Sequence, residues 1–277
     1  MTKKAAIRNR RELLRRSIDL SLEVLRTCGT TKRTDGVNLW VFMSFAKLIH
    51  TAQSARVLLD LHRTVDVKLL ARAVLDGLID IVFLLRGPIP RRRLTRLMTI
   101  EAAIDAYEDL SFQARLRGES VEQLVTKHPR LCWVIKNYEQ ARKDPLSQQT
   151  AQKAPITEKR WRFISMEEKL IPLKELAKAT TLFEYPLRTL GNAAAHARPA
   201  ILKEFARVGD DGMPRIQARQ KTRRFLLKSE WVALDIAICL LMAVDVLVDK
   251  YYLDSAFAGR LQSLIDTTPS LQRIRVN

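Results

Sequence analysis

The amino-acid sequence predicts an all-α protein, a helical bundle of about eight to ten helices, from three observations. Glycine and proline are scarce, at 9 and 10 of 277 residues, which disfavours a sheet-rich fold with many tight turns. Hydrophobic residues make up 47% of the chain, enough for a large buried core. Their spacing of three and four residues is the period of an amphipathic helix.

The first half of the chain reads as four helices. The N-terminal helix carries one apolar stripe on an otherwise basic surface. Its stripe consists of Leu14, Ile18, Leu22 and Leu25. The turn-rich segment 30–36 ends this helix, and the segment 87–90, which contains two prolines, ends the third. The expected helices are 5–28, 37–62, 67–86 and 91–117.

In the second half, serine or threonine precedes glutamine or glutamate by three residues at three places, the pattern of a capping box. These pairs are Ser120 with Gln123, Ser165 with Glu168, and Thr181 with Glu184. Pro129 predicts a kink or restart. The sequence 208–214 is the one hairpin signal. The expected helices are 120–143, 166–179, 181–197, a short one to Arg207, 231–252 and 254–265.

The segment 231–252 is apolar and long enough to cross a bilayer. It contains Asp235, Asp245 and Asp249, and each carboxylate would cost a few kcal/mol in lipid. We therefore expect a buried core helix with its aspartates at helix ends, in a cavity or beside basic side chains, and no integral membrane association.

We expect a single helical domain over residues 1–277, with a basic N-terminal helix at 1–33 and a possible sub-boundary at the polar loop 144–155. The charged N-terminus has no apolar signal region, which favours a cytoplasmic protein. The three cysteines are far apart in sequence and are expected to be reduced, buried thiols.

The formal net charge is +18, more than solubility requires, and it predicts a polyanion partner such as RNA, or else an acidic partner protein. Basic side chains gather in three clusters, where we expect contacts to phosphates. The candidate nucleic-acid-binding residues are Arg10, Arg11, Arg15, Arg91, Arg92, Arg93, Arg219, Arg223 and Arg224.

Phosphate-loop, dinucleotide-binding, nucleophile-elbow and zinc-protease motifs are absent from the sequence, and no cofactor or metal site is expected. One group of residues is a candidate catalytic site. It consists of Tyr185, Arg188, Asn192 and His196, whose spacing of three, four and four residues would align them on one face of a helix. Either His196 acts as a general acid or base beside Arg188, or it satisfies a buried hydrogen bond, with Asp76 or Asp80 as a partner.

The segment from Arg160 and Trp161 through Ser165 and Tyr185 to Asn192-Ala-Ala-Ala-His196 resembles the C-terminal signature of an uncharacterised bacterial family of all-helical proteins. The Arg72-xxx-Asp76 step within 67–86 resembles its upstream motif. The helix 67–86 is apolar on nearly every side, so we expect at least one of Arg72 and Asp76 to be buried. A buried charge needs a partner, and we therefore expect Arg72 or Asp76 to reach the helix of Asn192 and His196.

More distantly, Asn192-xxx-His196 is similar to the Arg-Asn-xxx-His core of the HEPN superfamily, although Gly191 occupies the position of that arginine and Arg188 is the nearest one upstream. The likeness implies a HEPN-like helical core, a homodimer, and a role in bacterial defence or toxin–antitoxin systems. Two functions stay open: a non-catalytic RNA-binding bundle, and a metal-independent endoribonuclease using His196, Arg188 and Asn192, with Tyr185, Arg72 and Asp76 in support.

Overall fold

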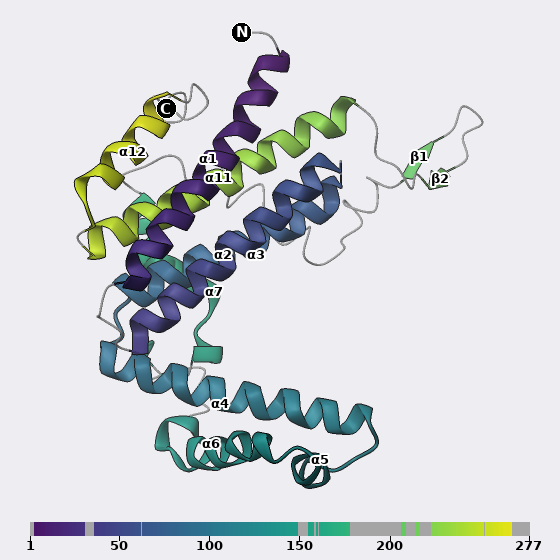
Figure 1. Cartoon of the computed structure of the whole chain (residues 1–277), viewed down its shortest axis with the longest axis vertical. Coiled ribbons are helices and arrows are strands. Elements are labelled where there is room, and N and C mark those ends of the chain that lie inside the picture. The colour runs from purple at the N-terminus through teal and green to yellow at the C-terminus, as the bar shows by residue number, and fades with distance from the viewer. Residues whose placement is uncertain are drawn as a thin grey trace. The chain divides into compact units, whose positions relative to one another are not determined.

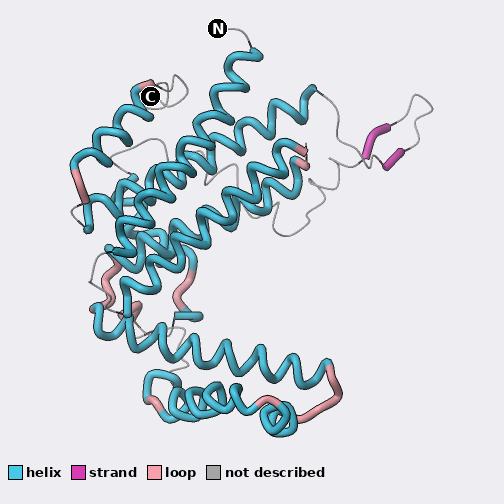
Figure 2. The backbone as a smooth tube through the Cα atoms, in the orientation of Figure 1, coloured by secondary structure: helices cyan, strands magenta, loops and turns pink. Residues whose placement is uncertain are grey.

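The computed structural model confirms the predicted all-α fold (Figures 1 and 2). The structure describes residues 3–30, 36–61, 63–148, 155–157, 159, 161–177, 206–208, 214–216, 223–251 and 253–267. Within these ranges, the only strands are two of three residues each. The scarcity of glycine and proline therefore predicted the fold class correctly.

The chain forms two compact units. The first unit contains Met1–Arg33, Val41–Leu85 and Pro172–Asn277, and the second contains Thr34–Trp40 and Arg86–Ile171. The chain thus leaves the first unit after Leu85 and returns at Pro172. The polar loop 144–155, where the sequence suggested a sub-boundary, falls inside the second unit.

Among the described residues, the first unit consists mainly of five helices. They are α1 (Lys3–Thr30), most of α2 (Gly36–Asp60), α3 (Thr64–Arg86), α11 (Arg223–Tyr251) and α12 (Ser255–Asp266). Helix α1 packs along α11 (Figure 1). Helices α2 and α3 approach closely at Gly77, where an added Cβ would lie 3.6 Å from the Leu48 side chain. That distance is an ordinary van der Waals contact, so alanine at Gly77 would fit against Leu48.

The buried face of α1 differs in part from the predicted stripe. Leu14 and Ile18 are buried as expected, but Leu22 and Leu25 are only half-buried. Ser17 and Ser21 lie fully buried beside them, because their hydroxyls donate to backbone carbonyls one turn earlier, at 2.8 and 2.7 Å. Small side chains with internally satisfied hydroxyls thus take part in the face that packs on the bundle.

Helix α11 begins at Arg223, earlier than the predicted start at residue 231. Its stretch Trp231–Tyr251 is the one helix among the described residues with the length and composition to cross a bilayer, and 89% of its apolar 18-residue window is buried by the rest of the protein. Asp235 is fully buried within the helix, whereas Asp245 and Asp249 are exposed. This burial pattern is that of a core helix, as the sequence predicted.

The second unit is built around α4 (Arg91–Leu116), α5 (Val121–Lys127) and α6 (Cys132–Lys143), with short 3-10 turns and the start of α7 (Met166–Ala177). The turns are Pro129–Leu131, Pro145–Gln148 and Trp161–Phe163. Helices α4 and α6 run antiparallel, because Arg96 pairs with Asp144 whereas Tyr107, further along α4, stacks on Tyr138, earlier on α6. Leu110, Ala114, Leu124 and Val134 form the core beneath them.

Two of the three predicted capping boxes are confirmed. The Ser120 hydroxyl accepts from the Gln123 backbone N–H, and the Gln123 side chain accepts from the Ser120 backbone N–H. Ser165 and Glu168 make the same reciprocal pair at the start of α7. The third box, at Thr181 and Glu184, lies outside the described residues. Pro129 separates α5 from α6, as predicted.

The predicted hairpin is confirmed by strands β1 (Ala206–Val208) and β2 (Pro214–Ile216), which pair antiparallel. The short helix expected to reach Arg207 is wrong at its end, because Arg207 is a strand residue. Each strand has only three residues, which is too few for the alternating pattern of a strand to be distinguished from the end of a helix.

The cysteine prediction holds for two residues of three. Cys28 and Cys239 are buried, and burial raises the pKa of the Cys28 thiol to about 11 and that of Cys239 further. Cys132 is exposed, so the prediction of a buried thiol is wrong there. It begins α6 on the side of that helix that faces solvent, a position that depends on packing and not on residue type.

Candidate nucleic-acid interface

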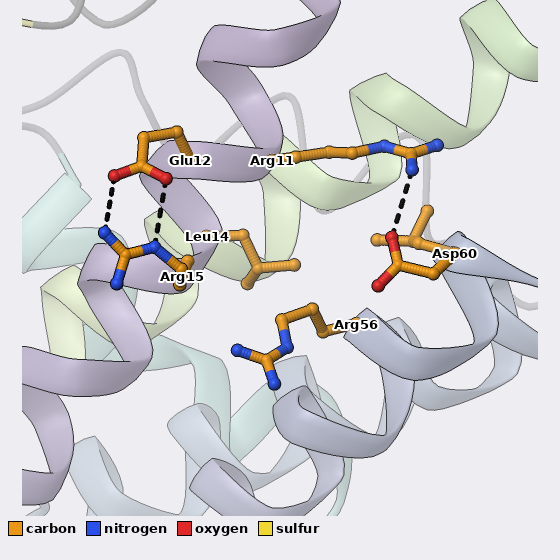
Figure 3. A pocket seen from close by; sticks show the side chains of 7 residues that line it. Arg11, Glu12, Leu14, Arg15, Arg56 and Asp60 are labelled. Atoms are coloured by element: carbon orange, nitrogen blue, oxygen red, sulfur yellow. Dashed lines mark hydrogen bonds and ion pairs between the residues drawn. The ribbon is translucent and has the colours of Figure 1, made fainter.

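A groove lined by three arginines lies between α1 and α2 in the first unit (Figure 3). Its volume is about 290 Å³. Arg11 and Arg15, one turn apart on α1, line one wall, and Arg56 and Asp60, one turn apart on α2, line the other. Leu14 and Leu59, buried by the surrounding helices, complete the lining with Glu12. The groove therefore combines an apolar base with charged walls.

Two of the three arginines are held by carboxylates. Arg11 donates to Asp60 at 3.1 Å, which ties the two helices together. Arg15 donates to both oxygens of Glu12, at 2.7 and 3.0 Å, and to Asp19 at 3.0 Å. The hydrogen bonds from Arg15 lower the pKa of Glu12 to about 2, so this carboxyl is ionised at neutral pH.

Arg56 is the third arginine, and sequence reasoning missed it. Its side chain is exposed and extends between Arg15 and Asp60 (Figure 3). It makes no hydrogen bond or ion pair with any other residue that the structure describes. The nearest lysine or arginine residues along the chain are Lys47 and Arg63, so Arg56 belongs to no cluster of basic residues in the sequence. Its spacing of four from Asp60 is the one local signal of a charged face.

Arg10, a predicted nucleic-acid-binding residue, has a packing role. Its guanidinium carbon lies 3.7 Å from the centre of the Trp231 ring, and the residue is half-buried. This cation–π contact joins α1 to α11. Arg10 does not line the arginine groove.

The run 91–93 lies in the second unit and presents one arginine to solvent. Arg91 is half-buried and donates to Asn38 Oδ1 at 2.6 Å. Arg93 is also half-buried. Arg92 is exposed and makes no hydrogen bond or ion pair within the described ranges. Of the third predicted cluster, Arg219 lies outside the described residues, and Arg223 and Arg224 begin α11.

Arg72 and Asp76 form an ion pair at 2.9 Å on α3, with side chains 17% and 38% exposed. Both residues are half-buried, so the prediction that at least one of them is buried is wrong. The residues it is expected to reach, Tyr185, Arg188, Asn192 and His196, lie outside the described residues, so a shared polar cluster stays a prediction. Among the residues described, no three histidine, cysteine or acidic side chains are placed to hold a metal ion.

No protein-family model, curated protein or solved structure matches this chain. The likeness to the bacterial helical family and to the HEPN superfamily stays a prediction, since most of its motif lies in residues 178–200, which are not described.

Proposed function

We propose that this protein binds RNA through phosphate contacts in the groove between α1 and α2. The observation that carries the proposal is Arg56, a guanidinium without a partner among the described residues, which faces a groove that also contains Arg11 and Arg15. The chain as a whole carries a charge of +18, which attracts polyanions over a distance.

Arginine suits this task because its planar fork donates two parallel hydrogen bonds to a phosphate. Arg56 is available without breaking an ion pair with a described residue, and Arg11 and Arg15 hold exposed carboxylates that a phosphate can replace. The two walls belong to different helices. A phosphate between them would therefore be contacted from two sides.

A membrane surface fits these observations less well than RNA. Membrane-bound amphipathic helices insert an apolar face between lipids. The apolar face of α1 is already buried, with Leu14, Ile18 and Val24 at 0 to 1% exposure. The groove thus offers charge without a free apolar face beside it on α1.

The test is fluorescence anisotropy with a labelled single-stranded RNA, an RNA duplex and polyglutamate, from low to physiological salt. Binding by phosphate contacts gives a linear fall of log affinity with log salt concentration. Arg56→Gln should reduce the magnitude of that slope by about 1. Arg115→Gln, which removes an exposed arginine on α4, is the matched control and should change it less.

If the two substitutions change the salt dependence equally, the groove is not the RNA-binding site. Absence of RNA binding at low salt, or an affinity that does not change with salt, would overturn it. Tighter binding of polyglutamate than of RNA would assign the groove to an acidic protein.

A further inference from the structure

The second unit contains a larger groove formed by the start of α2, α4 and α6, with a volume of about 650 Å³. Its lining includes two tryptophans, Trp40 and Trp133, with Leu39 and Ile100. Trp133 is 56% exposed and Leu39 is 52% exposed. We call this the tryptophan groove. Exposed aromatic and apolar side chains that meet in one groove are typical of a binding surface.

Helix α6 turns one face toward this groove. Trp133, Asn137 and Gln140 are spaced by four and three residues, and all three line it. The two amide side chains are exposed and form no hydrogen bonds with other described residues. Each amide offers a donor and an acceptor, the pair of functions that hydrogen-bonds the edge of a nucleobase.

Positive charge gathers at one end of the tryptophan groove. Arg96 on α4 donates to both oxygens of Asp144, after the end of α6, at 2.6 and 2.8 Å. Arg92 lies one turn before Arg96 on α4, and Lys143 is in the last turn of α6, so both lie at this end. Arg92 and Lys143 are exposed, and their side chains make no ion pair with the residues described.

We propose that the tryptophan groove binds an unpaired nucleobase of single-stranded RNA. The base stacks on Trp133, the side chains of Asn137 and Gln140 hydrogen-bond its edge, and the adjoining phosphate lies toward Arg92 and Lys143. Sequence-tolerant binding of single strands uses this combination of aromatic stacking and basic side chains. A purely apolar occupant would leave the two amides without hydrogen bonds.

This inference rests on the proposed RNA binding and adds a preference for bases over the bare phosphate chain. It is tested by comparing a single-stranded oligoribonucleotide with an abasic ribose-phosphate oligomer of equal length, which has the same charge but no bases. The wild-type protein should bind the oligoribonucleotide about tenfold more tightly. Trp133→Ala should bind the two oligomers equally.

The controls separate stacking from folding and from charge. Trp133→Phe keeps a ring and should retain part of the preference, and Asn137→Ala should reduce it. Phe112→Ala removes a ring that is 55% exposed on α4 outside the groove, and should behave as wild type. The salt dependence of Trp133→Ala should match wild type, because the phosphate contacts are unchanged.

The two proposals fail in different ways. If neither oligomer binds at low salt, the RNA-binding function is wrong and this inference fails with it. If both oligomers bind and Trp133→Ala leaves their affinity ratio unchanged, the function stands and the base site is wrong. Circular dichroism melting of each variant checks that the helices are intact.

Discussion

Glu12 accepts two hydrogen bonds from Arg15 and a third from Arg16, at 2.7, 3.0 and 2.9 Å, all within about one turn of α1. Its carboxylate thus occupies the guanidinium donors that a phosphate would use. The ion pair limits the positive charge of the arginine groove while the groove is empty. Binding of RNA at this point requires Arg15 to exchange one anion for another.

Replacing Glu12 should therefore strengthen RNA binding. We expect Glu12→Gln to raise affinity by about threefold to tenfold at low salt, because it weakens the hold on two of the Arg15 donors and removes a competing charge. Glu122→Gln removes an exposed carboxylate from α5 in the second unit and is the matched control. The two variants would give equal titration curves if Arg15 plays no part in binding.

RNA affinity should not change between about pH 5 and pH 8. The described residues that line the arginine groove include no histidine, and the pKa of Glu12, at about 2, is well below that range. Because folding lowers this pKa, the pair with Arg15 stabilises α1 at pH values above the ordinary pKa of 4.5. This stabilisation is lost as the pH falls through about 2. A binding midpoint near pH 6.5 would instead identify a histidine in the RNA contact.

Arg162→Ala should destabilise the second unit. Arg162 donates to Glu101, Asp105 and Glu108 on α4, at 2.7, 3.0 and 3.2 Å, and the Glu101 side chain is only 7% exposed. We expect a loss of about 2 kcal/mol in the free energy of unfolding, measured by urea denaturation. Arg115→Ala, on the exposed surface of α4, should cost much less, and equal losses would show that this cluster has no stabilising role.

Asp76→Ala should reduce the free energy of unfolding by about 1 kcal/mol or more. The change leaves the Arg72 guanidinium, 17% exposed, without the carboxylate that it now contacts. The double variant Arg72→Met/Asp76→Ala should lose less than the sum of the single changes, since the two residues act as a pair. Strict additivity would contradict this coupling. Combination with His196→Ala tests the predicted link to residues 185–196.

Total RNA incubated with the protein in EDTA should keep its length distribution. The arginine groove supplies charge for binding. Its described lining contains no histidine, and its carboxylates are an ionised Glu12 and an ion-paired Asp60. Gel analysis of wild type and His196→Ala provides the comparison. Cleavage in EDTA that disappears in His196→Ala would establish the alternative, a metal-independent ribonuclease.

The sequence by itself determined the helical fold and many helix boundaries. Ser120 with Gln123 and Ser165 with Glu168 form their caps within four residues, and Pro129 interrupts its helix through its own ring. Such signals depend on neighbours along the chain, so sequence spacing is sufficient to find them. The buried character of Trp231–Tyr251 was likewise evident from the aspartates within it.

Only the tertiary structure decided which charged side chains are available to a ligand. Arg11 hydrogen-bonds Asp60, which is 49 residues away in the sequence, and Arg10 makes a cation–π contact with Trp231. Arg56 stays exposed. These outcomes depend on how each helix is rotated against its neighbours. That rotation follows from the packing of whole apolar faces, and the spacing of charged residues along one segment does not predict it.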